Sequence, residues 1–312
     1  MLRLMMCQEE NMISLNVYLS TTGGSKRDIM KAFGEGAKKH GVEVCYIDQH
    51  HYRKSDFAMI FAHKSEGTDS RNHNFRQKVL DSHNDNIFFV DSNVLKAYEK
   101  DVRYFRFPQG SIHPHKANYM LDEDTSRNDQ IIKHMDLQIK PWRKEGKHIC
   151  LFLNRGIGGF STFGKPCYEW AKETIWNIRQ HTDRPILIRS HRHAGTNPQL
   201  TEDLKNLDDI MLEHTDITHT RLGETSIYDD LKNAWACVVH TSTSGAVAML
   251  EGIPMFSTHE ACFSHKWSAG SLSDIENPIL KDRTYYITHY ANAHWNLDEV
   301  TKGLYWEKYA AS

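Results

Sequence analysis

The sequence predicts an α/β fold, in which the strands of a parallel sheet alternate with helices along the chain. Two stretches carry this prediction. Residues 13–47 have the pattern of a strand, a helix and a strand, and residues 233–258 have the pattern of a strand, a polar turn, a helix and a strand. The apolar run 235–239 contains no charged residue, which is typical of a strand buried on both faces of a parallel sheet.

The first half of the chain supplies several such units in order. Its expected strands are 13–19, 42–47, 57–62 and 86–90, and its expected helices are 28–40 and 72–81. Residues 100–147 are expected to form loops and a linker, with one amphipathic helix near 129–139. Aromatic and basic residues alternate at 103–107, which fits either a strand with one solvated face or a patch that stacks bases and binds phosphates.

The second half repeats the alternation of strands and helices. Its expected strands are 148–154, 185–188 and 235–239, and its expected helices are 168–180, 225–231 and 246–251. Apolar and aromatic residues recur at near-helical spacing in the tail, so amphipathic helices are expected there. A chain of 312 residues is long enough for two domains that share a cleft, or for one large α/β domain.

Composition excludes several classes of protein. With 39% hydrophobic and 25% charged residues, the chain is an ordinary globular protein, and no apolar run could span a bilayer. Residues 1–12 are too short and too polar for a secretory signal. The six cysteines lack CxxC spacing, so we expect buried thiols in the cytoplasm. A net charge of −2 argues against a passive nucleic-acid coat, but an enzyme that touches DNA over a small basic face is still compatible with it.

Polar residues follow the strand at 235–239. Ser242, Thr243, Ser244 and Gly245 form a turn that opens a helix, and the unpaired amides at such a helix start attract anions. Ligands of open α/β sheets bind outside the carboxyl ends of the strands, so the turn is a candidate phosphate site. The alternative is that Ser242 or Ser244 only caps the helix.

The strand at 185–188 is also followed by polar residues. Arg189 and His191 lie two residues apart and would neutralise a diphosphate without a metal ion. The competing interpretation is a metal site built from His191, His193, His214 and His219. No cysteine joins these histidines and their spacing matches no zinc frame, so we expect no metal site.

A glycine-rich loop follows the strand at 148–154. Residues 159–165 match the beginning of a P-loop, but Pro166 replaces its hydroxyl residue and removes an amide, which argues against an NTPase. The loop still suits diphosphate binding, and Arg155, Gly158 and Gly159 are its candidate residues.

The segment HTSTSGAVAMLEGIPMF at 240–256, followed by Phe263, Trp267 and Gly270, resembles the donor-site end of GT-B glycosyltransferases. The similarity is to bacterial capsule-type sugar transferases and to phage enzymes that glycosylate hydroxymethylated bases in their own DNA. It runs from about residue 185 to the C-terminus. The resemblance implies two Rossmann-like domains with a cleft between them, at 1–145 and 146–290, and a final helix at 291–312 that packs back toward the first domain.

The resemblance also implies roles for individual residues. In such enzymes the turn that matches 242–245 holds the diphosphate of a nucleotide sugar, and a Glu in the following helix holds the ribose, for which Glu251 is the candidate. The glycine loop reaches toward the same donor. Arg189 and His191 would stabilise the leaving diphosphate.

The acceptor side is expected in the first half of the chain. A carboxylate there would deprotonate the acceptor hydroxyl, and Asp69 and Asp91 are the candidates, although Asp is also a common turn residue. Arg103 and Arg106 are the candidates for binding the acceptor.

These points together predict a metal-independent glycosyltransferase that needs no cofactor besides a UDP-sugar or a similar nucleotide sugar. The likeness to the phage enzymes covers 184–193, the turn and 293–306, so the expected acceptor is hydroxymethylated cytosine in duplex phage DNA, in the host cytoplasm. The alternatives are a capsule-type saccharide transferase, a nucleotide-sugar epimerase of the same fold, and a non-catalytic module that binds nucleic acid.

Overall fold

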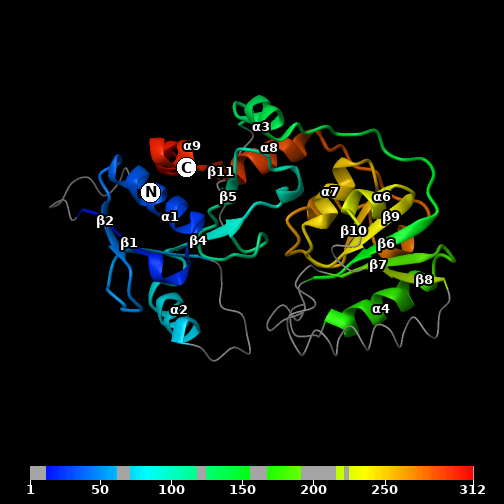
Figure 1. The fold of residues 1–312 in the computed structure, drawn as a ribbon, viewed down its shortest axis with the longest axis horizontal. Coiled ribbons are helices and arrows are strands. Elements are labelled where there is room, and N and C mark those ends of the chain that lie inside the picture. The colour runs from blue at the N-terminus through cyan, green and yellow to red at the C-terminus, as the bar shows by residue number, and fades with distance from the viewer. Residues whose placement is uncertain are drawn as a thin grey trace. The chain divides into compact units, whose positions relative to one another are not determined.

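The computed structural model describes residues 12–61, 71–117, 124–154, 167–190, 216–220 and 225–311. The chain divides into two compact units. Unit 1 comprises residues 1–64, 69–137 and 285–312, and unit 2 comprises residues 65–68 and 138–284. Each unit is built around its own sheet with helices against it, so the predicted α/β fold is confirmed (Figure 1).

Unit 1 contains a six-stranded sheet in the order β11-β5-β4-β3-β1-β2. Its strands are β1 (Ser14–Tyr18), β2 (Glu43–Ile47), β3 (Phe57–Phe61), β4 (Ile87–Ser92), β5 (Tyr104–Arg106) and β11 (His294–Asn296). Strands β1 to β4 are parallel, as predicted, whereas β5 pairs antiparallel with both β4 and β11. The alternating residues at 103–107 therefore include a strand.

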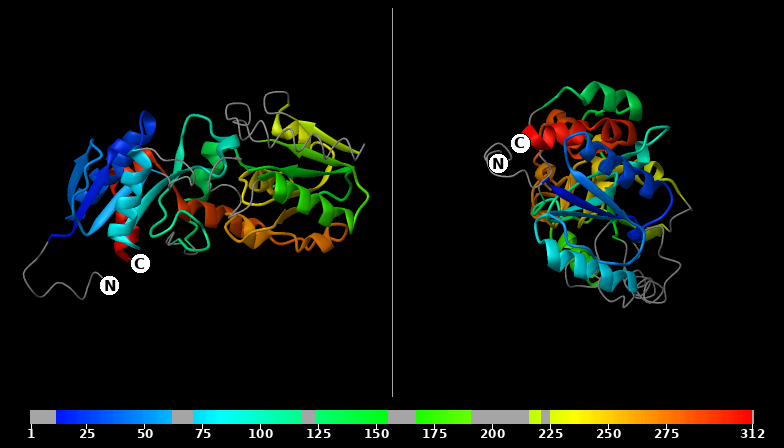
Figure 2. Two further views of the ribbon diagram at one scale, coloured as in Figure 1. Left: turned by 90° about the horizontal axis from the view of Figure 1, so that it is seen from below. Right: turned by 90° about the vertical axis from the view of Figure 1, so that its left-hand side faces the viewer.

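The helices of unit 1 cover both faces of this sheet. They are α1 (Ser25–Lys38), α2 (Arg71–His83), α3 (Asn128–Met135), α8 (Thr284–Ala293), α9 (Leu297–Lys302) and α10 (Leu304–Ala311), with the short 3-10 helices η2 (Leu19–Thr21) and η3 (Lys96–Tyr98). Phe75 and Val79 of α2 pack with one set of strand residues, whereas α1 and the C-terminal helices pack with the alternate set. Figure 2 (right) shows α2 in cyan and the C-terminal helices in red on opposite sides of the blue strands.

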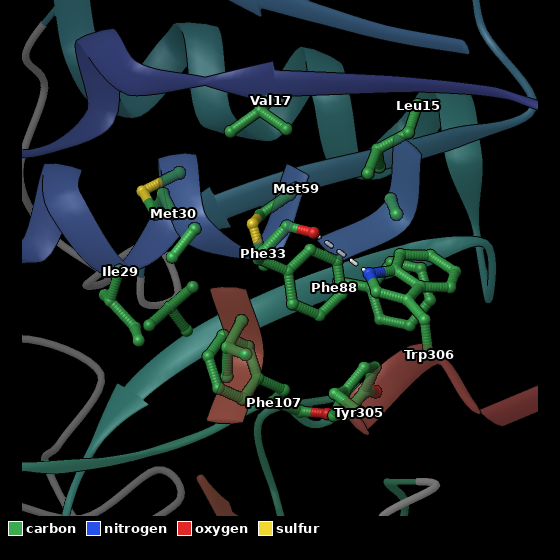
Figure 3. Packing of buried hydrophobic residues seen from close by; sticks show 14 of the residues in the cluster. Leu15, Val17, Ile29, Met30, Phe33, Met59, Phe88, Phe107, Tyr305 and Trp306 are labelled. Carbon is green, nitrogen blue, oxygen red and sulfur yellow. Dashed lines mark hydrogen bonds between the residues drawn. The ribbon is translucent and has the colours of Figure 1, made fainter. Parts of the chain in front are cut away.

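The C-terminal helices complete the core of unit 1. The Phe33 ring lies 4.9 Å from both the Tyr305 and Trp306 rings, and Trp306 Nε1 donates a 3.0 Å hydrogen bond to the Phe33 carbonyl (Figure 3). Helices α1 and α9 approach so closely that a Cβ at Gly36 would lie 2.3 Å from the Val300 carbonyl oxygen. Residues 285–311 are therefore an integral part of unit 1, whereas we expected the returning segment to begin at 291.

Unit 2 contains a five-stranded parallel sheet in the order β10-β9-β6-β7-β8. Its strands are β6 (His148–Phe152), β7 (Ile186–Arg189), β8 (Ile217–Thr220), β9 (Ala234–Val239) and β10 (Met255–Ser257). Its helices are α4 (Cys167–Arg179), α6 (Ile227–Leu231) and α7 (Ser244–Leu250), with the 3-10 helices η5 (His265–Trp267) and η6 (Leu272–Asp274). Helix α4 lies on one face of the sheet, and α6 and α7 lie on the other (Figure 1).

Unit 2 begins earlier in the chain than the expected boundary at 146. The Lys140 amide donates to the Leu250 carbonyl at 2.9 Å, and the Arg143 amide donates to the Gly252 carbonyl at 2.7 Å. Gly252 has a φ of 82°, and a Cβ there would lie 2.2 Å from the Pro141 carbonyl oxygen. Residues 140–143, which lie in the expected linker, are therefore hydrogen-bonded to the end of α7. The turn at Gly252 exposes the backbone carbonyls that accept these bonds.

Candidate functional site

The candidate site lies at the carboxyl edge of the unit 2 sheet. Because all five strands are parallel, the residues that follow them meet at one edge. Asn154 follows β6, Thr241 and Ser242 follow β9, and Thr258 follows β10. This edge is therefore lined by amide and hydroxyl groups in the part of unit 2 that the structure describes.

The turn after β9 opens helix α7 as predicted. The N-cap residue is Thr243, whose own side chain makes no capping bond, and the Ser244 amide donates a long 3.4 Å hydrogen bond to the Ser242 hydroxyl. Thr243 is exposed, and Ser242 and Ser244 are partly exposed. The bond to Ser242 agrees with the alternative that this hydroxyl caps the helix, and the role of the turn in binding a diphosphate stays a prediction.

Gly245 has a packing role in this turn. A Cβ at this position would lie 3.0 Å from Val239 Cγ2 and 3.1 Å from Met255 Cγ. Only a glycine lets α7 begin this close to β9 and β10, and this contact fixes where the first amides of the helix lie.

Asn154 is buried beside the turn. Its Nδ2 donates to Thr241 Oγ1 at 2.5 Å, and its Oδ1 is buried without a hydrogen-bond partner among the described residues. Buried amide oxygens are nearly always hydrogen-bonded in folded proteins. Asn154 Oδ1 is therefore an unsatisfied acceptor close to the turn.

A second group at the edge surrounds Thr258. Its Oγ1 accepts a 3.0 Å hydrogen bond from Trp170 Nε1 and lies 2.8 Å from His240 Nδ1. Burial, with a smaller contribution from the charge of His259, lowers the pKa of His240 to about 4. The imidazole is therefore neutral at neutral pH and adds hydrogen-bonding capacity to the edge without charge.

Asn154, His240 and Thr258 were not among the site residues expected from the sequence. The signal that could have found them is that each comes at most two residues after a buried strand. In a parallel sheet that position places a polar side chain at the ligand-binding edge.

Arg189 ends β7 at the same edge, but β6 separates β7 from β9. Arg189 and the turn therefore follow strands that are not neighbours, and two strand spacings amount to about 10 Å. The Arg189 guanidinium is buried, forms an ion pair with Asp230 and donates to the Thr225 carbonyl at 3.0 Å. Arg189 therefore anchors α6 to the sheet, and its part in binding a diphosphate stays a prediction.

Glu251 lies at the opposite end of α7 from the turn. It is the C-cap residue, and its carboxylate forms an ion pair with Lys140. Seven residues of helix place it about 10 Å from Ser244 along the axis. The ribose role stays a prediction, and for it the Glu251 carboxylate would have to share its ion pair with Lys140.

Two acceptor-side candidates in unit 1 bind each other. Asp91 on β4 lies opposite Arg106 on β5 in the antiparallel pairing of the two strands. Their side chains also form an ion pair, and Arg106 is buried. Asp91 Oδ1 also accepts a 2.7 Å hydrogen bond from the Ser92 amide. An Asp91 base would have to share its carboxylate with Arg106. Arg103 is exposed just before β5, and its role stays a prediction.

The remaining candidates lie outside the described residues: Asp69, Arg155, Gly158, Gly159 and His191, together with His193 and His214 of the alternative metal site. His219 lies on β8, and its side chain is not described. Elsewhere, within the described ranges, no three His, Cys, Asp or Glu side chains are grouped to hold a metal ion.

The comparisons with known proteins concern the fold. No family model matches the sequence, and no curated protein matches it. The "beta Kdo 2,7 transferase" of Thermosulfurimonas dismutans KpsC matches with a TM-score of 0.51 and 14% identity over 95% of this chain and 99% of that chain. The "beta Kdo 2,4 transferase" of the same protein matches with a TM-score of 0.51 and 10% identity over 95% of this chain and 98% of that chain. A UDP-GlcNAc 2-epimerase of Methanocaldococcus jannaschii matches with a TM-score of only 0.39 and 12% identity over 95% of this chain and 99% of that chain.

At these identities the two transferase domains show the fold alone. The chain has a two-domain α/β fold of the GT-B type, as the sequence resemblance implied. Among the described residues, no helix combines the length and the apolar character that a membrane crossing requires.

Proposed function

We propose that the protein is a glycosyltransferase that moves a sugar from a nucleotide-sugar donor to a hydroxyl acceptor without a metal ion. The observation that carries the proposal is the carboxyl edge of unit 2. There a helix start, three hydroxyl residues and the buried acceptor of Asn154 come together on a GT-B fold. Sugar transfer needs hydrogen-bond donors around a departing diphosphate, and helix amides and hydroxyls provide them.

The charge balance of the edge defines how it would hold the donor. His240 is neutral and Arg189 is paired with Asp230, so the described residues would bind a diphosphate through hydrogen bonds. The Ser242, Thr243 and Ser244 hydroxyls donate to phosphate oxygens, and Asn154 Oδ1 accepts from a donor hydroxyl. Any cationic contribution would come from Arg155 and His191.

For the acceptor, we propose a saccharide hydroxyl first. The two solved domains that share the fold are named as Kdo transferases, which is an argument by analogy. In addition, Arg106, one of the two arginines proposed to bind DNA, is buried against Asp91. Hydroxymethylcytosine in duplex phage DNA is the second candidate, supported by the sequence likeness at 184–193 and 293–306. An epimerase of the same fold is the third.

Thermal unfolding with a panel of nucleotides and nucleotide sugars tests the donor proposal. We expect at least one nucleotide to raise the melting temperature, because a ligand that binds only the folded state stabilises it. The double variant Ser242→Ala/Ser244→Ala should lose this shift. Ser82→Ala, on an exposed position of α2, is the matched control and should keep it. If no nucleotide stabilises the protein, the proposal fails.

Turnover assays then separate the functions. An epimerase converts a nucleotide sugar without any acceptor, whereas a transferase releases the nucleotide only when an acceptor is added. Oligosaccharide and hydroxymethylcytosine duplex DNA, supplied separately with the best donor, decide between the two acceptors.

A further inference from the structure

Unit 2 contains a groove that the proposed donor site does not use. Its volume is about 610 Å³, within the range of roughly 300–1,000 Å³ that is typical of small-molecule sites. One wall is formed by Asn177 and His181 at the end of α4. The others are formed by residues 256–258 of β10 and its end, and by His265 with residues 270–273.

The groove is polar, and its described residues carry no formal charge. Among the lining residues that the structure describes, none is Lys, Arg, Asp or Glu. Its polar groups are one amide, two imidazoles and the hydroxyls of Ser and Thr residues. Phosphates and carboxylates are recognised mostly by Arg and Lys or by the amides at the start of a helix, and the described lining supplies neither a Lys or Arg nor the start of an α-helix. A ligand with many uncharged hydroxyl groups matches it better.

An aromatic base is also a poor match for this lining. Phe256 supplies the aromatic ring of the groove and is only 1% exposed, so it offers no open face for stacking. The partly exposed Leu272 supplies apolar surface beside the polar groups. Sugars combine apolar C–H groups with hydroxyls, which matches a lining of mostly uncharged polar groups with some apolar surface.

His265 contributes a partly exposed imidazole to the lining. Its Nδ1 is buried and has no hydrogen-bond partner among the residues that the structure describes. Burial, and then the nearby Lys281 charge, lower the pKa of His265, so the ring is neutral at neutral pH. A neutral imidazole can both donate to and accept from sugar hydroxyls.

The wall opposite α4 is preformed. The Ser271 amide donates to Asp274 Oδ2 at 2.8 Å, and the two residues form a capping box. Gly270, with a φ of 114°, packs so tightly against this turn that a Cβ would lie 2.5 Å from Asp274 Oδ2. A ligand would therefore meet a wall that needs no ordering, which reduces the cost of binding.

We infer that this groove binds an uncharged saccharide residue. Thr258 links it to the candidate site, because Thr258 lines the groove and its hydroxyl lies against His240 at the carboxyl edge. We assign the groove as a subsite for a saccharide acceptor or product, and this assignment rests on the proposed function. The inference that the groove binds a saccharide does not rest on it.

Saturation-transfer NMR and calorimetry with glucose, N-acetylglucosamine and maltose test the inference, each in the absence of nucleotide. We expect at least one to bind, and the double variant Asn177→Ala/His181→Ala to weaken it about tenfold through the loss of two hydrogen-bonding groups. Both positions are exposed, Asn177 lies in α4, where alanine is favourable, and His181 lies in the turn after it, so the variant should fold. Gln180→Ala, exposed in the same turn and outside the described lining of the groove, is the matched control and should bind normally.

The inference is overturned if none of the three sugars binds, or if the double variant binds them as tightly as the control. Nucleotide binding, measured in parallel by thermal shift, keeps the two proposals apart. If nucleotides bind and the sugars do not, only the inference about the groove is refuted. If a sugar binds and no nucleotide does, the proposed function is refuted and the inference about the groove stands.

Discussion

Replacing Arg189 with alanine should destabilise unit 2. The guanidinium is buried with Asp230, which is 3% exposed, and it also donates to the Thr225 carbonyl at 3.0 Å. Alanine would leave the Asp230 carboxylate buried without its cation. Removing one partner of a buried ion pair typically costs about 3–5 kcal/mol. For a unit of this size, that corresponds to a fall of about 6–20 °C in the melting temperature.

Calorimetry and urea unfolding of Arg189→Ala measure this loss, with nucleotide binding measured below the transition. The double variant Arg189→Leu/Asp230→Leu is the control, since it removes both charges and should recover part of the lost stability. The reasoning is refuted if Arg189→Ala melts within 2 °C of the parent protein and loses only nucleotide affinity. In that case Arg189 would serve the ligand, as the sequence suggested, rather than the fold.

Two further predictions concern pH and the backbone. Because the pKa of His240 is about 4 in the folded protein and near 6.5 in the unfolded chain, the unfolded chain takes up the proton first. The free energy of unfolding should therefore fall as pH drops from about 6.5 to 4, by on the order of 3 kcal/mol, and urea unfolding of His240→Gln across this range should show a flatter profile. Gly252→Ala should destabilise far more than Gly41→Ala in thermal unfolding. Both glycines have a positive φ, but only Gly252 would place its Cβ within 2.2 Å of a carbonyl, whereas Gly41 faces open space. Equal losses would mean that the contact with Pro141 does not matter.

The strand, turn, helix and strand at 234–257 could be predicted because each element has a strong local signal. An uncharged apolar run precedes a polar turn, and Gly252 and Pro254 end the helix. Strands β5 and β11 have only three residues each and pair across the chain between Arg106 and His294. Such short strands have no periodicity to detect, so β11 was missed.

The candidate site could be predicted only in part for a related reason. A polar edge can be predicted from the residues that come directly after each strand of a parallel sheet. The partners of charged side chains cannot be predicted in this way. Arg189 and Asp91 looked available because Asp230 and Arg106 lie 41 and 15 residues away in sequence. Which charges neutralise each other is decided by tertiary packing, which a single sequence does not reveal.

The discontinuity of unit 1 has a consequence for synthesis of the protein. Phe33 and Phe88 are covered by Tyr305 and Trp306, which leave the ribosome after all of unit 2. Unit 2 can therefore fold while translation continues, but unit 1 must wait with an open apolar face until residues 285–311 emerge. A fragment that stops near residue 137 would keep that face exposed, so we expect it to aggregate or to recruit chaperones.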